Sequence, residues 1–207
     1  MKIKQAIIKG DIVETENIIK KRLIRNPTDI QLWFKLCLTE LQFPFEDYES
    51  ALQCIDHIYE MEPDNLYAII LETGIKWHSF GFIDEGLFER IIKIKCYDEK
   101  TAAIINYLQA LYYQFNKETK KQKSALEKSI KLYDGYVYPN KDLGQILLNN
   151  LQVEEGKRML KKAASNVRKV YLTDEAYNFT DKDTYIAEFI TGTNMSRENF
   201  ENMKQLL

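Results

Sequence analysis

Apolar residues recur three and four positions apart along most of the chain. The spacing is clear in AIIKGDIVETENIIKKRLI (6–24), LWFKLCLTEL (32–41), ESALQCIDHIYEM (49–61) and KSALEKSIKLY (123–133). This is the spacing of one face of an α-helix. The eight glycines and four prolines are too few for the many tight turns of an all-β protein. The sequence therefore predicts an all-α chain.

A longer period of about 35 residues is superimposed on the helical one, close to the ~34 residues of a tetratricopeptide unit. Small residues open successive amphipathic segments at Thr15, Ala51, Gly86, Ala125 and Gly156. Pro27 and Pro63 have a similar spacing of 36 residues, and each lies in a polar turn after a predicted helix (RNPTD and EPDN). A proline stops the helix before it, and the Asp or Asn that follows can cap the next helix.

The pattern resembles tetratricopeptide repeats. Trp33 stands where that family has the aromatic residue of its first helix, Leu143 and Gly144 match its Leu-Gly pair, and Gly156 matches its small helix-packing position. The resemblance implies an all-α, right-handed solenoid of about five antiparallel helix pairs. We expect a helical repeat domain over 1–170 and a C-terminal cap over 171–207 packed on the last repeat, as one domain. A HEAT-like or irregular α-solenoid remains an alternative.

Charge is segregated along the chain, although the net charge is only −2. Residues 26–90 carry thirteen acidic and three basic side chains, whereas residues 91–170 carry sixteen basic and eight acidic ones. Blocks of one sign steer partners of the opposite sign and raise association rates. The acidic block therefore favours a basic protein partner. Solvation of exposed helix faces, or pairing between the two blocks, explains the same pattern without a partner.

The groove that a tetratricopeptide fold would form supplies a second set of candidate residues. If the first helix of each unit lines the concave face, the candidate partner-binding residues are Tyr67, Glu72, Trp77, His78, Tyr107 and Gln114. Tyr and Trp bury much area with few rotatable bonds, which suits interface anchors. Trp77, beside His78 and Gly74, is the one that we expect to form a pocket wall. Trp33 is expected in the core between helices.

Motifs for catalysis or metal binding are missing from the sequence. The glycines form no GxGxxG or phosphate loop, and the histidines, His57 and His78, lack HExxH spacing. Cys54 and His57 lie three apart on one helix face, but Cys54 falls on the apolar stripe, which predicts burial. We therefore expect no enzyme activity, no catalytic residues, no metal and no cofactor. The short apolar stretch near the N-terminus and the lack of an apolar run near ~18 residues predict a cytoplasmic protein without a membrane partner.

The resemblance implies a non-catalytic protein-binding module. The chain also has a faint likeness to small all-helical immunity proteins of bacterial toxin systems, in LGQILLNNLQVEEGKRMLKKAASNV (143–167) and the tail after it. The most specific hypothesis is therefore a protein that neutralises a basic nuclease toxin. Its expected contacts are acidic residues at turns or helix starts, namely Glu46, Asp47, Glu49, Asp84 and Glu85. A tetratricopeptide adaptor that binds a peptide in its groove is the alternative, and a nucleic-acid binder acting through residues 117–162 is another.

Overall fold

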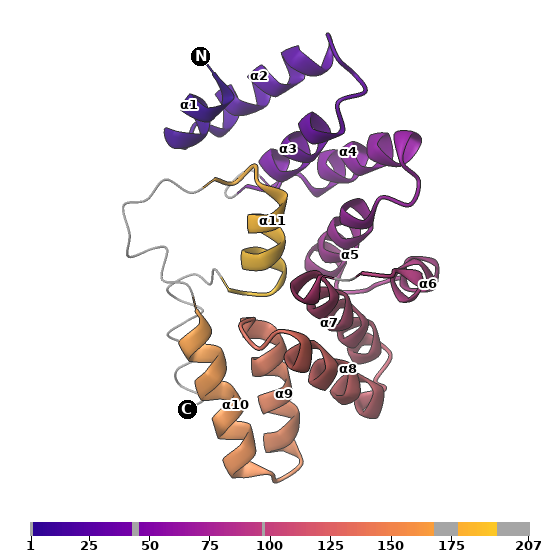
Figure 1. Cartoon of the computed structure of the whole chain (residues 1–207), viewed down its shortest axis with the longest axis vertical. Coiled ribbons are helices and arrows are strands. Elements are labelled where there is room, and N and C mark those ends of the chain that lie inside the picture. The colour runs from indigo at the N-terminus through magenta and orange to yellow at the C-terminus, as the bar shows by residue number, and fades with distance from the viewer. Residues whose placement is uncertain (1, 43–45, 97, 168–177, 194–207) are drawn as a thin grey trace. The chain divides into compact units, whose positions relative to one another are not determined.

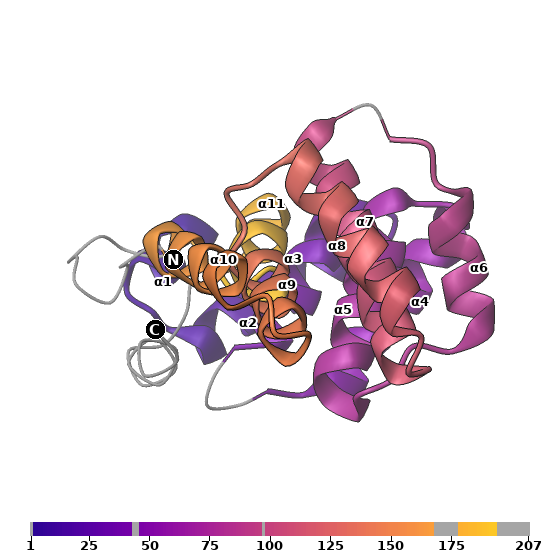
Figure 2. The same cartoon turned by 90° about the horizontal axis from the view of Figure 1, so that it is seen from below.

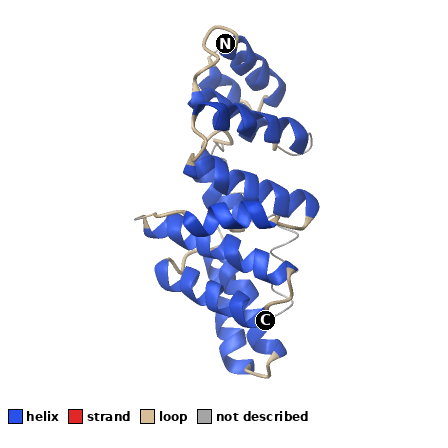
Figure 3. Ribbon diagram, turned by 90° about the vertical axis from the view of Figure 1, so that its right-hand side faces the viewer, coloured by secondary structure: helices blue, strands red, loops and turns tan. Residues whose placement is uncertain are grey.

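The computed structural model describes residues 2–42, 46–96, 98–167 and 178–193, and every regular element in them is helical (Figures 1 and 3). The helices are α1 (Ile3–Ile8), α2 (Ile12–Leu23), α3 (Ile30–Glu40), α4 (Tyr48–Met61), α5 (Leu66–Phe80), α6 (Glu85–Lys93), α7 (Glu99–Phe115), α8 (Thr119–Leu132), α9 (Val137–Asn149), α10 (Val153–Asn166) and α11 (Lys182–Tyr185). A π-helical segment, Ile186–Ile190, follows α11. The all-α prediction is confirmed. No described helix is long and apolar enough to cross a membrane.

The even-numbered helices α2 to α10 begin at residues 12, 48, 85, 119 and 153, at intervals of 36, 37, 34 and 34 residues. The predicted period is therefore present, but two of the small residues that were used to find it are not in phase. The fourth residue of these helices is Thr15, Ala51, Phe88, Gln122 and Gly156 in turn. Gly86 is an exposed second residue of α6, and Ala125 is a buried seventh residue of α8. The apolar stripe therefore determines how each of these helices is oriented in its repeat. A small residue occupies the fourth helix position only at Thr15, Ala51 and Gly156.

Aspartates start many of the helices. Asp11, Asp29, Asp47, Asp84 and Asp98 each precede a helix and accept a hydrogen bond from the backbone N–H three residues later. This contact satisfies one of the free N–H groups at a helix start and places negative charge at the positive end of the helix dipole. Part of the acidic character of the chain therefore encodes its helix boundaries.

The chain divides into two compact units, and the first contains Met1–Ser79 with Asp174–Tyr185. Within it α2 packs on α3 and α3 on α4, around side chains such as Ile19, Leu38 and Ile58. The C-terminal helix α11 also packs on α3, and Figure 1 shows the two side by side. Lys182 of α11 lies over the ring of Tyr67, with Nζ 3.8 Å from the ring centroid.

The second unit contains Phe80–Thr173 with Ile186–Leu207. Here α7 packs on α8, α8 on α9 and α9 on α10, and Figure 2 shows α7 and α8 lying along each other. The end of the described chain packs on α9, because the backbone N–H of Tyr138 donates to the carbonyl of Thr191 at 2.8 Å. Within the described residues of the C-terminal segment, α11 contacts α3 in the first unit and Thr191 contacts the start of α9 in the second. Residues 171–177 and 194–207 of the expected cap lie outside the described residues.

Helices α9 and α10 approach closely where both carry glycine. A Cβ atom on Gly156 would lie 2.8 Å from Cγ of Leu148 and 3.0 Å from the carbonyl oxygen of Gly144. A Cβ atom on Gly144 would in turn lie 3.0 Å from the carbonyl oxygen of Gly156. The two glycines therefore permit the helix contact, and Gly156 has the helix-packing role that the resemblance implied for it.

We expect Gly156→Ala to lower the free energy of unfolding by about 1–3 kcal/mol, because the new methyl group overpacks a backbone contact. Gly86→Ala is the matched control. It lies in an exposed helix position with ordinary space for a Cβ atom, so we expect no loss and a gain of up to ~1 kcal/mol from helix propensity. Urea unfolding of the two variants measures both values, and equal effects would contradict the close-contact assignment.

Candidate protein-binding sites

A pocket of about 440 Å³ lies in the first unit between α2, α3 and α4. Each of the three helices contributes one stripe of side chains to it. The lining consists of Lys20, Leu23 and Ile24 from α2 and its end, Trp33, Leu36 and Glu40 from α3, and Ser50, Gln53, Cys54 and His57 from α4. We call this the Trp33 pocket.

One wall of the Trp33 pocket is a stacked pair of rings. Trp33 and His57 have ring centroids 4.2 Å apart and an interplanar angle of 27°. The indole N–H of Trp33 donates to the carbonyl of Pro27 at 2.7 Å, and Nδ1 of His57 lies 3.1 Å from Oε2 of Glu60. Both rings are therefore held by polar contacts at their edges. The wall is a preformed aromatic surface.

The floor of the pocket is apolar. Leu23 and Leu36 are buried, and Ile24, with 82% of its surface exposed, stands at the rim. Cys54 is buried as the sequence predicted, and burial raises the pKa of its thiol to about 12. The thiol is therefore neutral at physiological pH and behaves as a small apolar group.

An ion pair also lines the pocket. Nζ of Lys20 is 3.3 Å from Oε1 of Glu40 and also pairs with Glu16 one helical turn earlier. The Glu40 side chain is only 11% exposed, and burial raises the pKa of its carboxyl above the usual value. The pocket therefore combines an aromatic wall, an apolar floor and a half-buried carboxylate whose cation is shared with a second carboxylate.

The second unit has a groove at the equivalent place, between α8, α9 and α10, with a volume of about 390 Å³. Counted from their helix starts, Glu127, Asn140, Met159 and Lys162 occupy the positions that Lys20, Trp33, Cys54 and His57 occupy in the first unit. This groove has no aromatic side chain in its lining, which contains three basic and three acidic side chains. The repeat geometry thus creates such grooves, and the side chains alone make the Trp33 pocket distinct.

The predicted groove residues of the first unit are already occupied by the protein itself. Tyr67 lies under Lys182 of α11. Glu72 accepts a hydrogen bond from the hydroxyl of Tyr59 at 2.7 Å and pairs with Lys76 at 2.9 Å. Trp77 is half-buried and His78 is exposed, and neither lines one of the pockets found in the described residues. Trp33, which was expected in the core, is half-buried and lines a pocket.

The predicted groove residues of the second unit differ in exposure. Tyr107 is only 3% exposed, so it belongs to the core rather than to a binding surface. Its hydroxyl hydrogen-bonds to Asp142, and burial raises the pKa of that carboxyl to about 6. Gln114 is exposed near the end of α7, where its side-chain oxygen accepts from Gln122 at 3.2 Å.

The predicted acidic contacts fall into two groups. Glu46, Asp47 and Glu49 are exposed at the start of α4 in the first unit, whereas Asp84 and Glu85 lie at the start of α6 in the second. Asp47 caps α4 through the backbone N–H and the hydroxyl of Ser50, which hold the pKa of its carboxyl below the usual value. Ser50 itself lines the Trp33 pocket, so the first acidic group adjoins that pocket.

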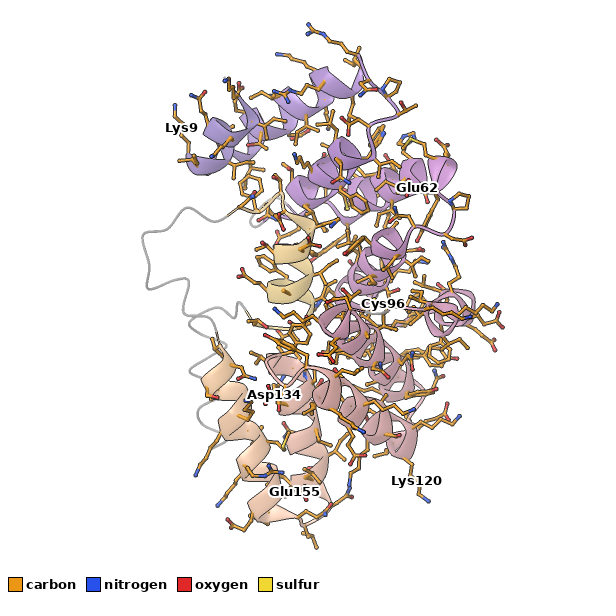
Figure 4. All side chains as sticks on the ribbon, in the orientation of Figure 1. Lys9, Glu62, Cys96, Lys120, Asp134 and Glu155 are labelled. Atoms are coloured by element: carbon orange, nitrogen blue, oxygen red, sulfur yellow. The ribbon has the colours of Figure 1, made fainter. Side chains whose placement is uncertain are left out.

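The basic block has two different environments. Many of its charges are paired on the surface, as in the contacts of Lys121 with Glu118 and of Lys162 with Asp134. Lys120, at the start of α8, points away from the helices (Figure 4). Outside the block of residues 91–170, a cavity of about 630 Å³ in the first unit is lined by Lys2, Lys4, Arg22 and Lys35 with isoleucines of α1 and residues of the segment 178–181. Its cations make it suited to an anionic group rather than to a metal.

Some signals of the Trp33 pocket were present in the sequence. The Cys54–His57 spacing placed both residues on one face of α4, and Trp33 stood at a repeat position. Their meeting depends on how α3 packs against α4, which the spacing within one helix does not determine. In the described part of the chain, no group of three or more His, Cys, Asp or Glu side chains could hold a metal ion.

Comparisons with known structures agree on the fold. The chain is similar to MamA (18% identity, covering 80% of this chain and 95% of that chain, TM-score 0.62). It is also similar to MamA 41-end from Desulfovibrio magneticus RS-1 (14%, 79% and 90%, 0.61) and to TTC0263, a thermophilic TPR protein in Thermus thermophilus (17%, 82% and 91%, 0.56). No family model and no curated protein matches the sequence. The fold is a tetratricopeptide-like α-solenoid, as the repeat pattern predicted.

The raised pKa of Asp142 generates a prediction about pH. The folded carboxyl keeps its proton up to about pH 6, whereas an unfolded Asp releases it near pH ~3.9. Its contribution to stability is therefore complete below pH ~4 and is lost as the pH rises through about 6. We expect Asp142→Asn to raise the free energy of unfolding by about 1–2 kcal/mol at pH 7.5 and to change it little at pH 4.

Urea unfolding at both pH values measures this difference. Asp134→Asn is the control, because its carboxylate is largely exposed and pairs with Lys162 on the surface. A gain for Asp142→Asn that is the same at pH 4 and pH 7.5 would contradict the raised pKa of the carboxyl.

Proposed function

We propose that the protein is a protein-binding scaffold and that its partner docks at the Trp33 pocket. The observation that supports this proposal is that α3 lines an open pocket and also packs against another helix of the protein. One stripe of this helix, with Trp33, Leu36 and Glu40, lines an open pocket, whereas α11 already packs on the helix from elsewhere. Two of the predicted groove residues, Tyr67 and Glu72, contact other side chains of the protein, whereas the Trp33 pocket is open.

The pocket has the properties of an interface anchor site. Its volume of about 440 Å³ lies in the range of ~300–1,000 Å³ that is typical of ligand pockets, so it can hold one or two side chains of a partner. Tryptophan is enriched at the residues that dominate binding energy. Ile24, exposed at the rim, offers apolar surface that a partner would cover.

The exposed isoleucine provides a direct test. We expect Ile24→Asp to weaken capture of the partner at least about tenfold, because a charge at the rim must be desolvated on binding. Leu151→Asp is the matched control: Leu151 is 86% exposed, lies in the second unit and has a positive φ that Asp tolerates well.

The measurement is quantitative mass spectrometry of proteins that bind the immobilised wild type and both variants. The proposal requires a partner that binds the wild type and Leu151→Asp equally and is lost with Ile24→Asp. A partner that is retained by Ile24→Asp and lost with Leu151→Asp would place the binding surface elsewhere.

A second candidate function is that of an immunity protein, which neutralises a basic bacterial nuclease toxin in the cytoplasm. The observation that favours it is the group of exposed carboxylates at Glu46, Asp47 and Glu49 beside the Trp33 pocket. Hydrogen bonds lower the pKa of Asp47, so it remains ionised. Such a group would pair with the Lys and Arg side chains of a nucleic-acid-binding cleft and would accelerate association.

Reversing the two glutamates tests this second function. We expect Glu46→Lys with Glu49→Lys to slow association with a basic nuclease toxin that the chain neutralises about tenfold at low salt, and much less at high salt. Glu127→Lys with Glu155→Lys changes the net charge equally in the second unit and should have a smaller effect. Stopped-flow measurements give both rates, and equal slowing by the two double variants would contradict a localised acidic site.

A further inference from the structure

We infer that the Trp33 pocket binds an arginine side chain of the partner, with its guanidinium stacked on the Trp33 ring and hydrogen-bonded to Glu40. This inference rests on the proposed function and names the chemistry that the pocket recognises. The ring wall, the carboxylate and the apolar floor together match the three parts of an arginine side chain.

The carboxylate of Glu40 shares its cation with a second carboxylate. Lys20 serves both Glu16 and Glu40, and its side chain is half exposed, whereas that of Glu40 is only 11% exposed. A half-buried carboxylate gains more from a charged hydrogen bond than an exposed one. A second cation that enters the pocket can take Glu40 and leave Lys20 paired with Glu16.

The aromatic wall favours arginine over lysine. A guanidinium is planar, stacks on aromatic faces and donates through a rigid fork to a carboxylate, whereas an ammonium group is compact and strongly hydrated. Trp33 is fixed by its hydrogen bond to Pro27 and by its stacking with His57. The wall therefore needs little reorganisation to receive a planar cation.

The remaining surfaces fit the rest of the side chain. The methylene groups of an arginine can lie on Leu23, Leu36 and the neutral thiol of Cys54, as long cationic side chains commonly do on apolar surface. Outside the pocket, the carboxylates at the start of α4 attract a basic segment toward it. The equivalent groove of the second unit lacks the ring wall.

A pair of short peptides tests the inference on the full chain. The probes are Ac-Gly-Leu-Arg-Leu-Gly-NH2 and the same peptide with citrulline, which has the shape of arginine without its charge. The chain contains two tryptophans, so a Trp77→Phe background leaves Trp33 as the fluorescent reporter. We expect a saturable change in fluorescence with the arginine peptide and at least about tenfold weaker binding of the citrulline peptide.

Two variants of the ion pair must then act in opposite directions. Glu40→Gln removes the acceptor and should weaken binding of the arginine peptide about tenfold, whereas Lys20→Met removes the competing cation and should strengthen it several-fold. Asp134→Asn and Lys162→Met make the same changes in the ion pair of the equivalent groove and should leave the affinity unchanged. Circular dichroism confirms that each variant is folded.

The outcomes separate this inference from the proposed function. Equal binding of the two peptides, or weakening by both Glu40→Gln and Lys20→Met, overturns the arginine site. If Ile24→Asp still abolishes capture of a partner in that case, the pocket binds its partner by another side chain. If the arginine peptide binds as expected but Ile24→Asp leaves partner capture intact, the arginine site stands and the docking surface proposed for the partner is wrong.

Discussion

A pair of antiparallel helices cannot bury both of its apolar faces by itself, and this constraint governs the whole chain. Each pair needs a neighbour, so the helices repeat at intervals of 34–37 residues and pack in series within each unit. The contact is closest where Gly144 and Gly156 face each other. Where the series leaves a face uncovered, the C-terminal segment supplies the missing neighbour, on α3 in the first unit and on α9 in the second.

The packing of the C-terminal segment on the repeats affects which surfaces can bind a partner. The segment that stabilises the repeats also occupies residues that a groove-binding protein would offer to a peptide, as the contact of Lys182 with Tyr67 shows. On another stripe of α3 the packing of α2, α3 and α4 leaves an open pocket instead. The side chains that line it, rather than the repeat fold, determine what it binds, because the equivalent groove of the second unit has a different lining.

The sequence predicted the fold, whereas the surroundings of the candidate site residues depend on packing that a local pattern does not specify. Helical periodicity, proline turns and the Gly144–Gly156 pair are local signals, and each corresponds to a feature of the structure. Trp33 was expected in the core, yet it lines a pocket together with His57 of the next helix. Burial of Tyr107, and the distribution of the acidic residues over two units, likewise depend on packing between helices that are distant in sequence.

Hydrogen exchange tests the central claim most directly, when it is measured with and without a saturating partner. If binding occurs at the Trp33 pocket, amides of Lys20–Arg25 and of Ser50–Ile58 should exchange more slowly in the complex, while those of α5 and α11 remain as in the free protein. Slower exchange confined to α5, with faster exchange in α11, would instead show a partner that displaces the C-terminal helix, and would contradict this account.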